Sequence, residues 1–169
     1  MDSSKIASPA MALRTALRTA TKGYSDRDVT ETAQIIIKFL YNLSLGHFSN
    51  VVYRNVGFID ENSRAELFIG WAKSPAYESF CVFQAPQLKD ILKFCEKQGI
   101  LKNIDDSLHV QLIHAALAEL IRKGKVTAHS SDASDSRYAP DDSALIKFCE
   151  HEAHMRKIRR ALKHTSEVK

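Results

Sequence analysis

The residues from Ser107 to Pro140 constrain the fold of this chain more than any other segment. They begin with an amphipathic run that ends at Gly124, and a β-branched stretch from Val126, a Ser/Asp-rich tip and a second short stretch from Ser136 follow. An apolar spacing near 3.6 residues predicts a helix, and glycine commonly ends one. Two short strand-like stretches around a polar tip predict a β-hairpin. The segment therefore predicts one long helix followed directly by a small hairpin.

The composition is that of an ordinary globular protein. The chain has 169 residues, of which 44% are hydrophobic and 26% charged, and its net charge is +4. This mild basic excess permits an acidic partner without requiring one. The cysteines Cys81, Cys95 and Cys149 are odd in number and far apart, which predicts reduced core residues in an intracellular protein, cytoplasmic or nuclear. No apolar run approaches the length of a membrane span, so we expect no membrane partner.

The N-terminal residues 1–26 allow two interpretations. From Ser3 to Ser25 there is no acidic residue, and basic residues are interspersed with Ala, Thr and Ser, which is the composition of a mitochondrial or plastid transit peptide. Asp2 is unusual in such a peptide, and the repeated Ala-Leu-Arg-Thr at Ala12 and Ala16 also fits a short basic helix. We favour a flexible basic arm, with mitochondrial import as the minority alternative.

Further helices are expected on both sides of the Ser107 segment. One opens near Asp28 and stops at Gly46, one covers Asp60 to Trp71, one ends at Gly99, and the last covers Asp141 to about His164. The residues from His47 to Phe58 fit a strand or a short helix equally well. For Tyr77 to Phe83 the pattern indicates only probable core residues, namely Phe80, Val82 and Phe83.

The Ser107 helix carries the first group of candidate binding residues. Its predicted apolar face consists of Val110, Ile113, Leu117, Leu120 and Ile121, extended by Leu108, Leu112 and Ala116. The remaining stripe is Ser107, Gln111, His114, Ala118 and Arg122. Gln, His and Arg side chains can hydrogen-bond base edges, while Lys123 and Lys125 could hold phosphate. The alternative is a plain solvated face, and Glu119 near the stripe would repel phosphate.

The segment from Gln87 to Pro140 resembles the winged-helix superfamily in the order of its elements. The resemblance is carried by a helix ending Phe-Cys-Glu-Lys-Gln-Gly99, a helix closing Leu-Ile-Arg-Lys-Gly-Lys-Val126, and a hairpin ending at Arg137 and Tyr138. It implies a recognition helix and a wing. The chain departs from the pattern between Gly99 and Ser107, where there is little room for the usual middle helix: either Ile100 to Asp106 form an abbreviated turn or the register of the resemblance is wrong. The tip of the hairpin also carries two acids and no base, which makes a poor phosphate clamp.

The C-terminal helix carries the second group of candidate binding residues. Arg156, Lys157, Arg159 and Arg160 place four positive charges within five residues, suited to nucleic acid or an acidic protein surface. The apolar stripe of this helix thins after Ala153, so its first half should dock on the core and its basic half should project. A homodimer through this helix is a further alternative.

No motif for catalysis, a cofactor or a metal stands out. The chain has no Gly-rich phosphate loop and no nucleophile elbow, so we expect no enzyme and no cofactor. Cys149, His151 and His154 are residue types that can bind zinc. However, Cys149 and His151 are only two residues apart, so their side chains point in different directions on a helix, and we expect no metal site. The motif Pro86-x6-Lys93-Phe-Cys-Glu recurs from Pro140, which we interpret as two helices with similar starts.

Together these patterns predict a mainly α fold with a small β-hairpin, built as a winged-helix-like module with flanking helices. We expect a flexible arm at 1–26, a helical N-terminal half at 27–84, the winged-helix-like region at 85–140, and a C-terminal helix at 141–169 packed on the same core. The predicted function is a non-enzymatic nucleic-acid-binding protein, with duplex DNA foremost, such as a regulator. The alternative is a helical interaction or assembly subunit in which the winged-helix-like region binds a partner protein.

Overall fold

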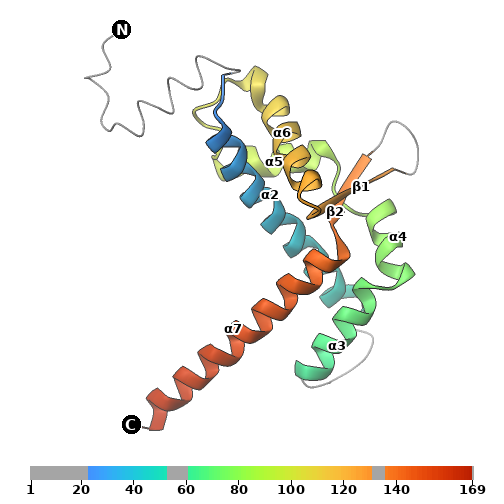
Figure 1. The fold of residues 1–169 in the computed structure, drawn as a ribbon, viewed down its shortest axis with the longest axis vertical. Coiled ribbons are helices and arrows are strands. Elements are labelled where there is room, and N and C mark those ends of the chain that lie inside the picture. The colour runs from blue at the N-terminus through green and yellow to red at the C-terminus, as the bar shows by residue number, and fades with distance from the viewer. Residues whose placement is uncertain (1–22, 53–60, 131–135, 169) are drawn as a thin grey trace.

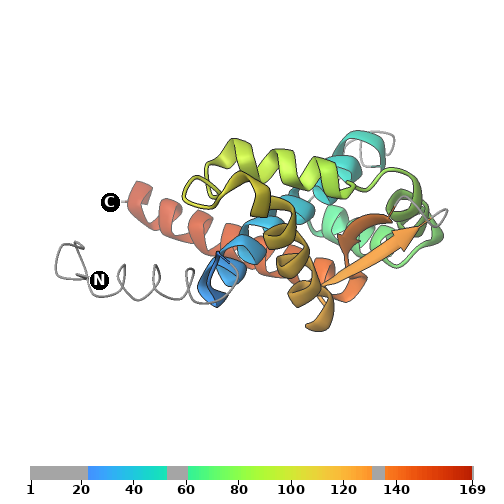
Figure 2. The same cartoon turned by 90° about the horizontal axis from the view of Figure 1, so that it is seen from above.

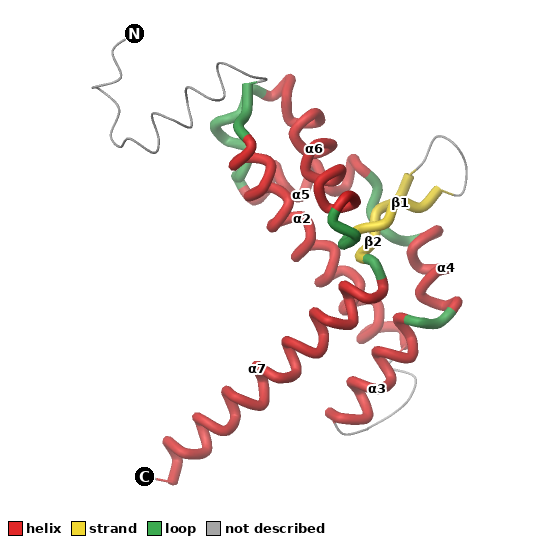
Figure 3. The backbone as a smooth tube through the Cα atoms, viewed as in Figure 1, coloured by secondary structure: helices red, strands yellow, loops and turns green. Residues whose placement is uncertain are grey.

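The computed structural model describes residues 23–52, 61–130 and 136–168 (Figure 1). The helices are α2 (Asp26–His47), α3 (Glu61–Ala72), α4 (Pro75–Phe83), α5 (Leu88–Gln98), α6 (His109–Arg122) and α7 (Asp142–Val168). The strands β1 (Val126–Ser130) and β2 (Ser136–Pro140) form a two-stranded antiparallel hairpin (Figure 3). The prediction of a mainly α fold with a small β-hairpin is therefore confirmed.

Two hydrophobic clusters hold these elements together. The first joins α2, α5, α6 and β1, which lie side by side in both views of the ribbon (Figures 1 and 2), and it includes the fully buried Ile36, Ile91 and Ile113. The second joins α3, α4 and the first turns of α7 around Phe68 and Leu145. The hairpin contributes to both clusters, so it connects them.

Helix α2 begins at a capping box. Asp28 donates its backbone N–H to the Ser25 hydroxyl at 3.2 Å, and its carboxylate accepts the Ser25 backbone N–H at 2.7 Å. Tyr24, just before the cap, is buried in the first cluster. Gly23 has φ +88° and a Cβ there would collide with Leu108, so the chain requires glycine at this position. The predicted arm and transit peptide otherwise lie outside the described residues.

The predicted stop of α2 at Gly46 is wrong. The helix runs to His47 and continues as a π-helical turn over Phe48–Val52, and the glycines with positive φ are Gly23, Gly99 and Gly124. The π turn places Phe48, which is 1% exposed, edge-on against Phe68 in the second cluster. Burial of Phe48 therefore outweighs the local preference of glycine for a helix end. Residues 53–60, the rest of the ambiguous segment, lie outside the described residues.

Helices α3 and α4 form one side of the second cluster. The predicted helix over Asp60 to Trp71 is confirmed by α3, and Trp71 packs edge-on against Tyr77 of α4. Phe80 is buried as expected, but Phe83 is 65% exposed, which contradicts the prediction. The reason is helical periodicity, because Phe83 lies outside the arc that Tyr77, Phe80 and Cys81 turn toward the core.

Helices α5 and α6 are joined by a compact connection. Helix α5 ends as predicted at Gly99, whose φ is +77°. The following residues form turns and then a 3-10 helix over Asp106–Leu108, which leads directly into α6. Three helices surround the first cluster, and in chain order they are α2, α5 and α6. In the sequence, α3 and α4 lie between α2 and α5.

The buried face of α6 differs from the prediction at two positions. Leu112, Ile113, Ala116, Leu117 and Leu120 are buried as expected. Val110 and Ile121, which we predicted to be core residues, are each 42% exposed. The buried arc is rotated toward Leu112 and Ala116, and His109 rather than Val110 is buried at the start of the helix.

His109 holds the connection between α5 and α6. Its Nε2 lies 3.1 Å from the Leu101 carbonyl oxygen and 3.0 Å from that of Ile104, and its Nδ1 lies 2.9 Å from the Glu96 carboxylate. Carbonyls and ionised carboxylates only accept hydrogen bonds, so the arrangement suits an imidazolium with both nitrogens protonated. Burial alone would lower the pKa of His109, but these bonds, with Asp106 at 3.6 Å, raise it above its usual value.

The hairpin matches the predicted position and is tied to the start of α5. Val126 pairs with Pro140, and Ser130 pairs with Ser136. Gln87 forms an isolated bridge with Arg137, and Tyr138 donates its backbone N–H to the Pro86 carbonyl at 2.9 Å. The acidic tip at 131–135 lies outside the described residues.

Helix α7 starts beside the turn that follows α6. Asp141 donates its backbone N–H to the Lys125 carbonyl at 2.8 Å, and Leu145 is fully buried. Beyond Ala153 most side chains are exposed, and the helix extends away from α6 (Figure 1). As expected from the repeated motif, α5 and α7 begin two residues after Pro86 and Pro140.

The revised phase of α6 gives a stability prediction. Leu117 is 2% exposed, so Leu117→Ala should lower the free energy of unfolding by roughly 2 to 5 kcal/mol. Val110→Ala, at a half-exposed position on the same helix, should cost less than about 1 kcal/mol. Urea denaturation of both variants checks this, and equal losses would contradict the phase.

The bonding of His109 predicts a pH dependence. Because its folded-state pKa is raised, its contribution is fully present below about pH 6.5 and is lost as pH rises through the folded-state pKa. The unfolding free energy of the wild type should therefore fall, relative to that of His109→Gln, as pH rises from about 6 to about 9. Denaturant titrations across this range measure the difference, and a constant difference would show that His109 is neutral when folded.

Candidate nucleic-acid interface

The outward face of α6 carries the predicted stripe, but the stripe is less polar than expected. Ser107, Gln111, His114, Ala118 and Arg122 are all exposed. The exposed Val110 and Ile121 lie on the same face. The Ser107 hydroxyl already donates to Asp105 at 2.9 Å. The face is therefore a mixture of hydrogen-bonding and apolar groups.

The positive charge at the end of α6 is partly offset by Glu119. Arg122 lies 2.6 Å from the Glu119 carboxylate, and Lys123 Nζ lies 3.4 Å from it. The hydrogen bond from Arg122 lowers the pKa of Glu119, so this carboxylate stays ionised. These exposed pairs exchange with water and with other ligands at low cost, so Lys123 remains able to contact an anion.

A basic groove lies where the end of α6, the start of α7 and α2 meet. It has a volume of about 510 Å³. Its lining residues are Tyr41, Lys123, Gly124, Lys125, Ser143, Ala144, Lys147, Phe148 and His151, and we call it the lysine groove. No carboxylate is among these lining residues. In the groove, the predicted Lys123 and Lys125 lie together with Lys147 and His151. Lys147 and His151 were not predicted as binding residues.

An aromatic pair forms part of the lysine groove. The rings of Tyr41 from α2 and Phe148 from α7 stack with centroids 4.3 Å apart. Burial and the nearby Asp141 raise the pKa of Tyr41, so its phenol stays protonated. The pair fixes α7 on α2 and thereby holds Lys147 next to the turn with Lys123 and Lys125.

The second group of predicted residues lies apart from this groove. Arg156, Lys157, Arg159 and Arg160 are exposed on the projecting half of α7. Asp141 at the start of α7 is hydrogen-bonded to Lys125, so Arg156 lies about 20 Å along the helix from Lys125, and about 7.5 Å beyond His151 at the edge of the groove. At 100° per residue, Arg156 and Arg160 point about 160° away from Lys147 and His151. The predicted site residues therefore form two separate surfaces.

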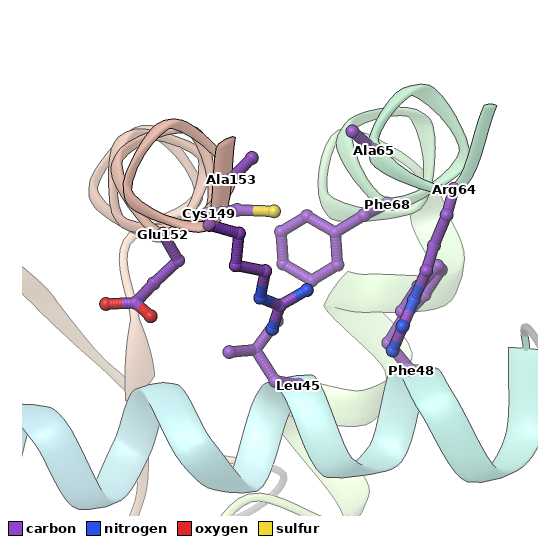
Figure 4. A pocket seen from close by; sticks show the side chains of 9 residues that line it. Leu45, Phe48, Arg64, Ala65, Phe68, Cys149, Glu152 and Ala153 are labelled. Atoms are coloured by element: carbon purple, nitrogen blue, oxygen red, sulfur yellow. The ribbon is translucent and has the colours of Figure 1, made fainter. Parts of the chain in front are cut away.

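A smaller pocket opens on the other face of α7 (Figure 4). It has a volume of about 70 Å³. Its lining residues are Leu45, Phe48, Arg64, Ala65, Phe68, Cys149, Glu152, Ala153 and Arg156, and we call it the Arg64–Arg156 pocket. Its walls are mostly apolar, with ionic groups from both α3 and α7 among the lining residues.

The described residues contain no cluster of three or more His, Cys, Asp or Glu side chains suited to a metal ion. Burial raises the pKa of Cys81 to about 11 and that of Cys95 to about 12, so both stay protonated thiols. Burial also raises the pKa of Cys149, against the opposing charges of Arg156 and Arg64. Within the same residues, no helix is long and apolar enough to cross a membrane.

No protein-family model, curated protein or solved structure matches this chain. The charges and contacts of its own surfaces are therefore the grounds for assigning a function. These are the α6 face, the lysine groove and the basic half of α7.

The exposure of the second half of α7 predicts that it contributes little to stability. Deleting residues 156–169 should change the melting temperature by less than about 2 °C, because exposed charged side chains add little to folding. Differential scanning calorimetry of the truncated chain tests this. A much larger drop would show that this half of the helix is buried in an assembly.

Proposed function

We propose that this chain is a non-enzymatic nucleic-acid-binding protein of the winged-helix type, and that its lysine groove holds the phosphate backbone. The observation that carries the proposal is the meeting of Lys123, Lys125 and Lys147 around one groove, with no carboxylate among its described lining residues. Lysines on a nucleic-acid-binding surface replace the counterions of the phosphates, and this supplies most of the affinity. Duplex DNA is the foremost ligand.

The arrangement of helices supports the winged-helix interpretation. Helices α2, α5 and α6 share one core and the β1–β2 hairpin follows α6 directly. In this interpretation α2 is the first helix and α5 is the middle helix, so no further helix is needed between Gly99 and Ser107. Helix α6 corresponds to the recognition helix and the hairpin to the wing.

The mode of binding that these surfaces favour depends mainly on charge. Gln111 and His114 can reach base edges, but the exposed Val110 and Ile121 beside them offer no hydrogen bonds. Glu119 reduces the positive charge at the end of α6. We therefore expect strong salt dependence and modest sequence preference.

The second candidate function is a protein-interaction or assembly subunit that uses the same α6 face. The observation that favours it is the exposure of Val110 and Ile121, each 42%, on the face predicted to read bases. Half-exposed apolar side chains on an accessible face are common in protein interfaces. In that case the face would bind a partner protein and the lysine groove would be incidental.

A pair of charge reversals tests the first candidate. Lys147→Glu should weaken binding to a fluorescein-labelled duplex by about tenfold or more at low salt, because it places a negative charge among the phosphates. Lys93→Glu is the matched control. Lys93 holds the same place in the repeated motif and is also exposed, but it lies on α5 and does not line the groove. Its effect should be less than about threefold. Fluorescence anisotropy with duplex and single-stranded probes measures both variants.

The same titrations separate the two candidates. No binding by the wild type even at low salt, or equal losses for Lys147→Glu and Lys93→Glu, would contradict the proposed groove. Val110→Glu and Ile121→Glu should impair a protein interface and weaken nucleic-acid binding only modestly. A partner whose binding requires Val110 and Ile121, together with no affinity for nucleic acid, would support the second candidate.

A further inference from the structure

The face of α7 that packs on the protein changes character as the helix leaves the body. Leu145 and Cys149 belong to the second cluster, the former fully buried. At 100° per residue, the next side chains on this face after Ala153 are Arg156, Arg160 and Lys163. All three are exposed. The apolar inner face therefore continues as a basic ridge, which we define as these three residues.

The Arg64–Arg156 pocket lies where this change occurs. Figure 4 shows Phe68 of α3 and the Cys149 sulfur facing one another across the pocket, with Leu45 of α2 at its base. The Arg64 guanidinium donates to the Ser49 hydroxyl at 3.0 Å, which holds it beside Phe48. Arg156, the first residue of the ridge, lines the same pocket. An apolar cavity and positive charge thus adjoin.

We propose that the Arg64–Arg156 pocket and the basic ridge bind an acidic segment of a partner protein. The tip of one apolar side chain of this segment enters the pocket between Phe68 and Ala153, and the carboxylates of the segment pair with Arg156, Arg160 and Lys163. The ridge spans eight residues of helix, and its two ends lie about 10 Å apart, which matches two turns of a helical peptide. A single small anion would use only one end of it.

The charges and shape of the site favour this occupant over the others. A second copy of α7 would place the same basic ridge against itself, and like charges repel. Duplex DNA could follow the ridge, but its bases are paired and stacked inside the helix and enter a pocket only when they are flipped out. A membrane would be met by the opposite face, which carries the exposed Ile158 and Leu162, and would leave the pocket unused. Glu152 at the pocket reduces the local charge without reversing it.

The probe for the test is a fluorescein-labelled helical peptide of about 16 residues, rich in Ala and Glu, with one central Phe. The full-length chain should bind it, and replacing the Phe by Ala should weaken binding by about fivefold or more. Arg156→Glu should weaken binding by about tenfold or more. Lys157→Glu is the matched control, because it makes the same charge change at the next residue, which points about 100° away. Its effect should be less than about threefold.

The Cys149 thiol provides a second readout inside the pocket. Cys149 lines the pocket, whereas Cys81 and Cys95 are buried. Saturating peptide should slow alkylation of Cys149 by iodoacetamide by about fivefold or more, and the Phe-to-Ala peptide should protect it less. Mass spectrometry assigns the modified cysteine.

Three results would overturn the proposal. The first is no binding of the acidic peptide at low salt. The second is an equal loss for Arg156→Glu and Lys157→Glu with no effect of the Phe, which would mean unspecific charge attraction. The third is binding to phosphatidylserine vesicles or to duplex DNA that depends on Arg156 while the peptide does not bind. Lys147→Glu should leave peptide binding unchanged, so failure of the nucleic-acid proposal is distinguishable from failure of this one.

Discussion

The packing of α6 on α2 is the contact on which the rest of the structure depends. Ile36 and Leu40 of α2 meet Ile113 and Leu117 of α6 in the first cluster, and all four are buried. This contact fixes where α6 ends and therefore where the turn with Lys125 lies. The hairpin starts from that turn, and α7 is hydrogen-bonded to it through Asp141. The positions of the groove lysines thus follow from one helix–helix interface.

Helix α7 divides the surface between two kinds of chemistry. Its Lys147 face completes the lysine groove together with α2 and the end of α6. Its Arg156 face begins at an apolar pocket against α3 and continues as a basic ridge. In our proposals, nucleic acid binds the first face and an acidic protein segment binds the second. Because the two faces point in nearly opposite directions, both ligands can be bound at once.

The sequence predicted the local elements better than their surroundings. Turn residues predicted the hairpin and the helix ends at Gly99 and Gly124, and these agree with the structure. Helical periodicity predicted that Gln111 and His114 are exposed, which also agrees. The pattern failed where tertiary packing decides, as at Phe48, whose burial carries the chain past Gly46. The pattern also predicted that Val110 is buried. Nothing in the neighbouring sequence shows that His109 is buried instead, through its bonds to Glu96 and two carbonyl groups.

The candidate site was only partly predictable for the same reason. Lys123 and Lys125 lie at the base of the predicted wing and were therefore predicted as phosphate contacts, whereas Lys147 becomes their neighbour only through the stacking of Phe148 on Tyr41. The basic run from Arg156 looked like part of one nucleic-acid surface. Its helical phase and its distance from Lys125 separate it from the groove. Residues far apart in the sequence define both surfaces, and no spacing rule connects them.

The most direct test of whether the lysine groove holds the phosphate backbone is an NMR titration with duplex DNA at low salt. The lysines of the chain are first ¹³C-methylated by reductive methylation. This treatment keeps the positive charge and gives each lysine a separate signal. We predict that the signals of Lys123, Lys125 and Lys147 shift together and saturate at one affinity, while that of Lys93 stays in place. Shifts confined to Lys157 and Lys163, with the groove lysines unchanged, would contradict this prediction and would place the nucleic acid on the projecting half of α7.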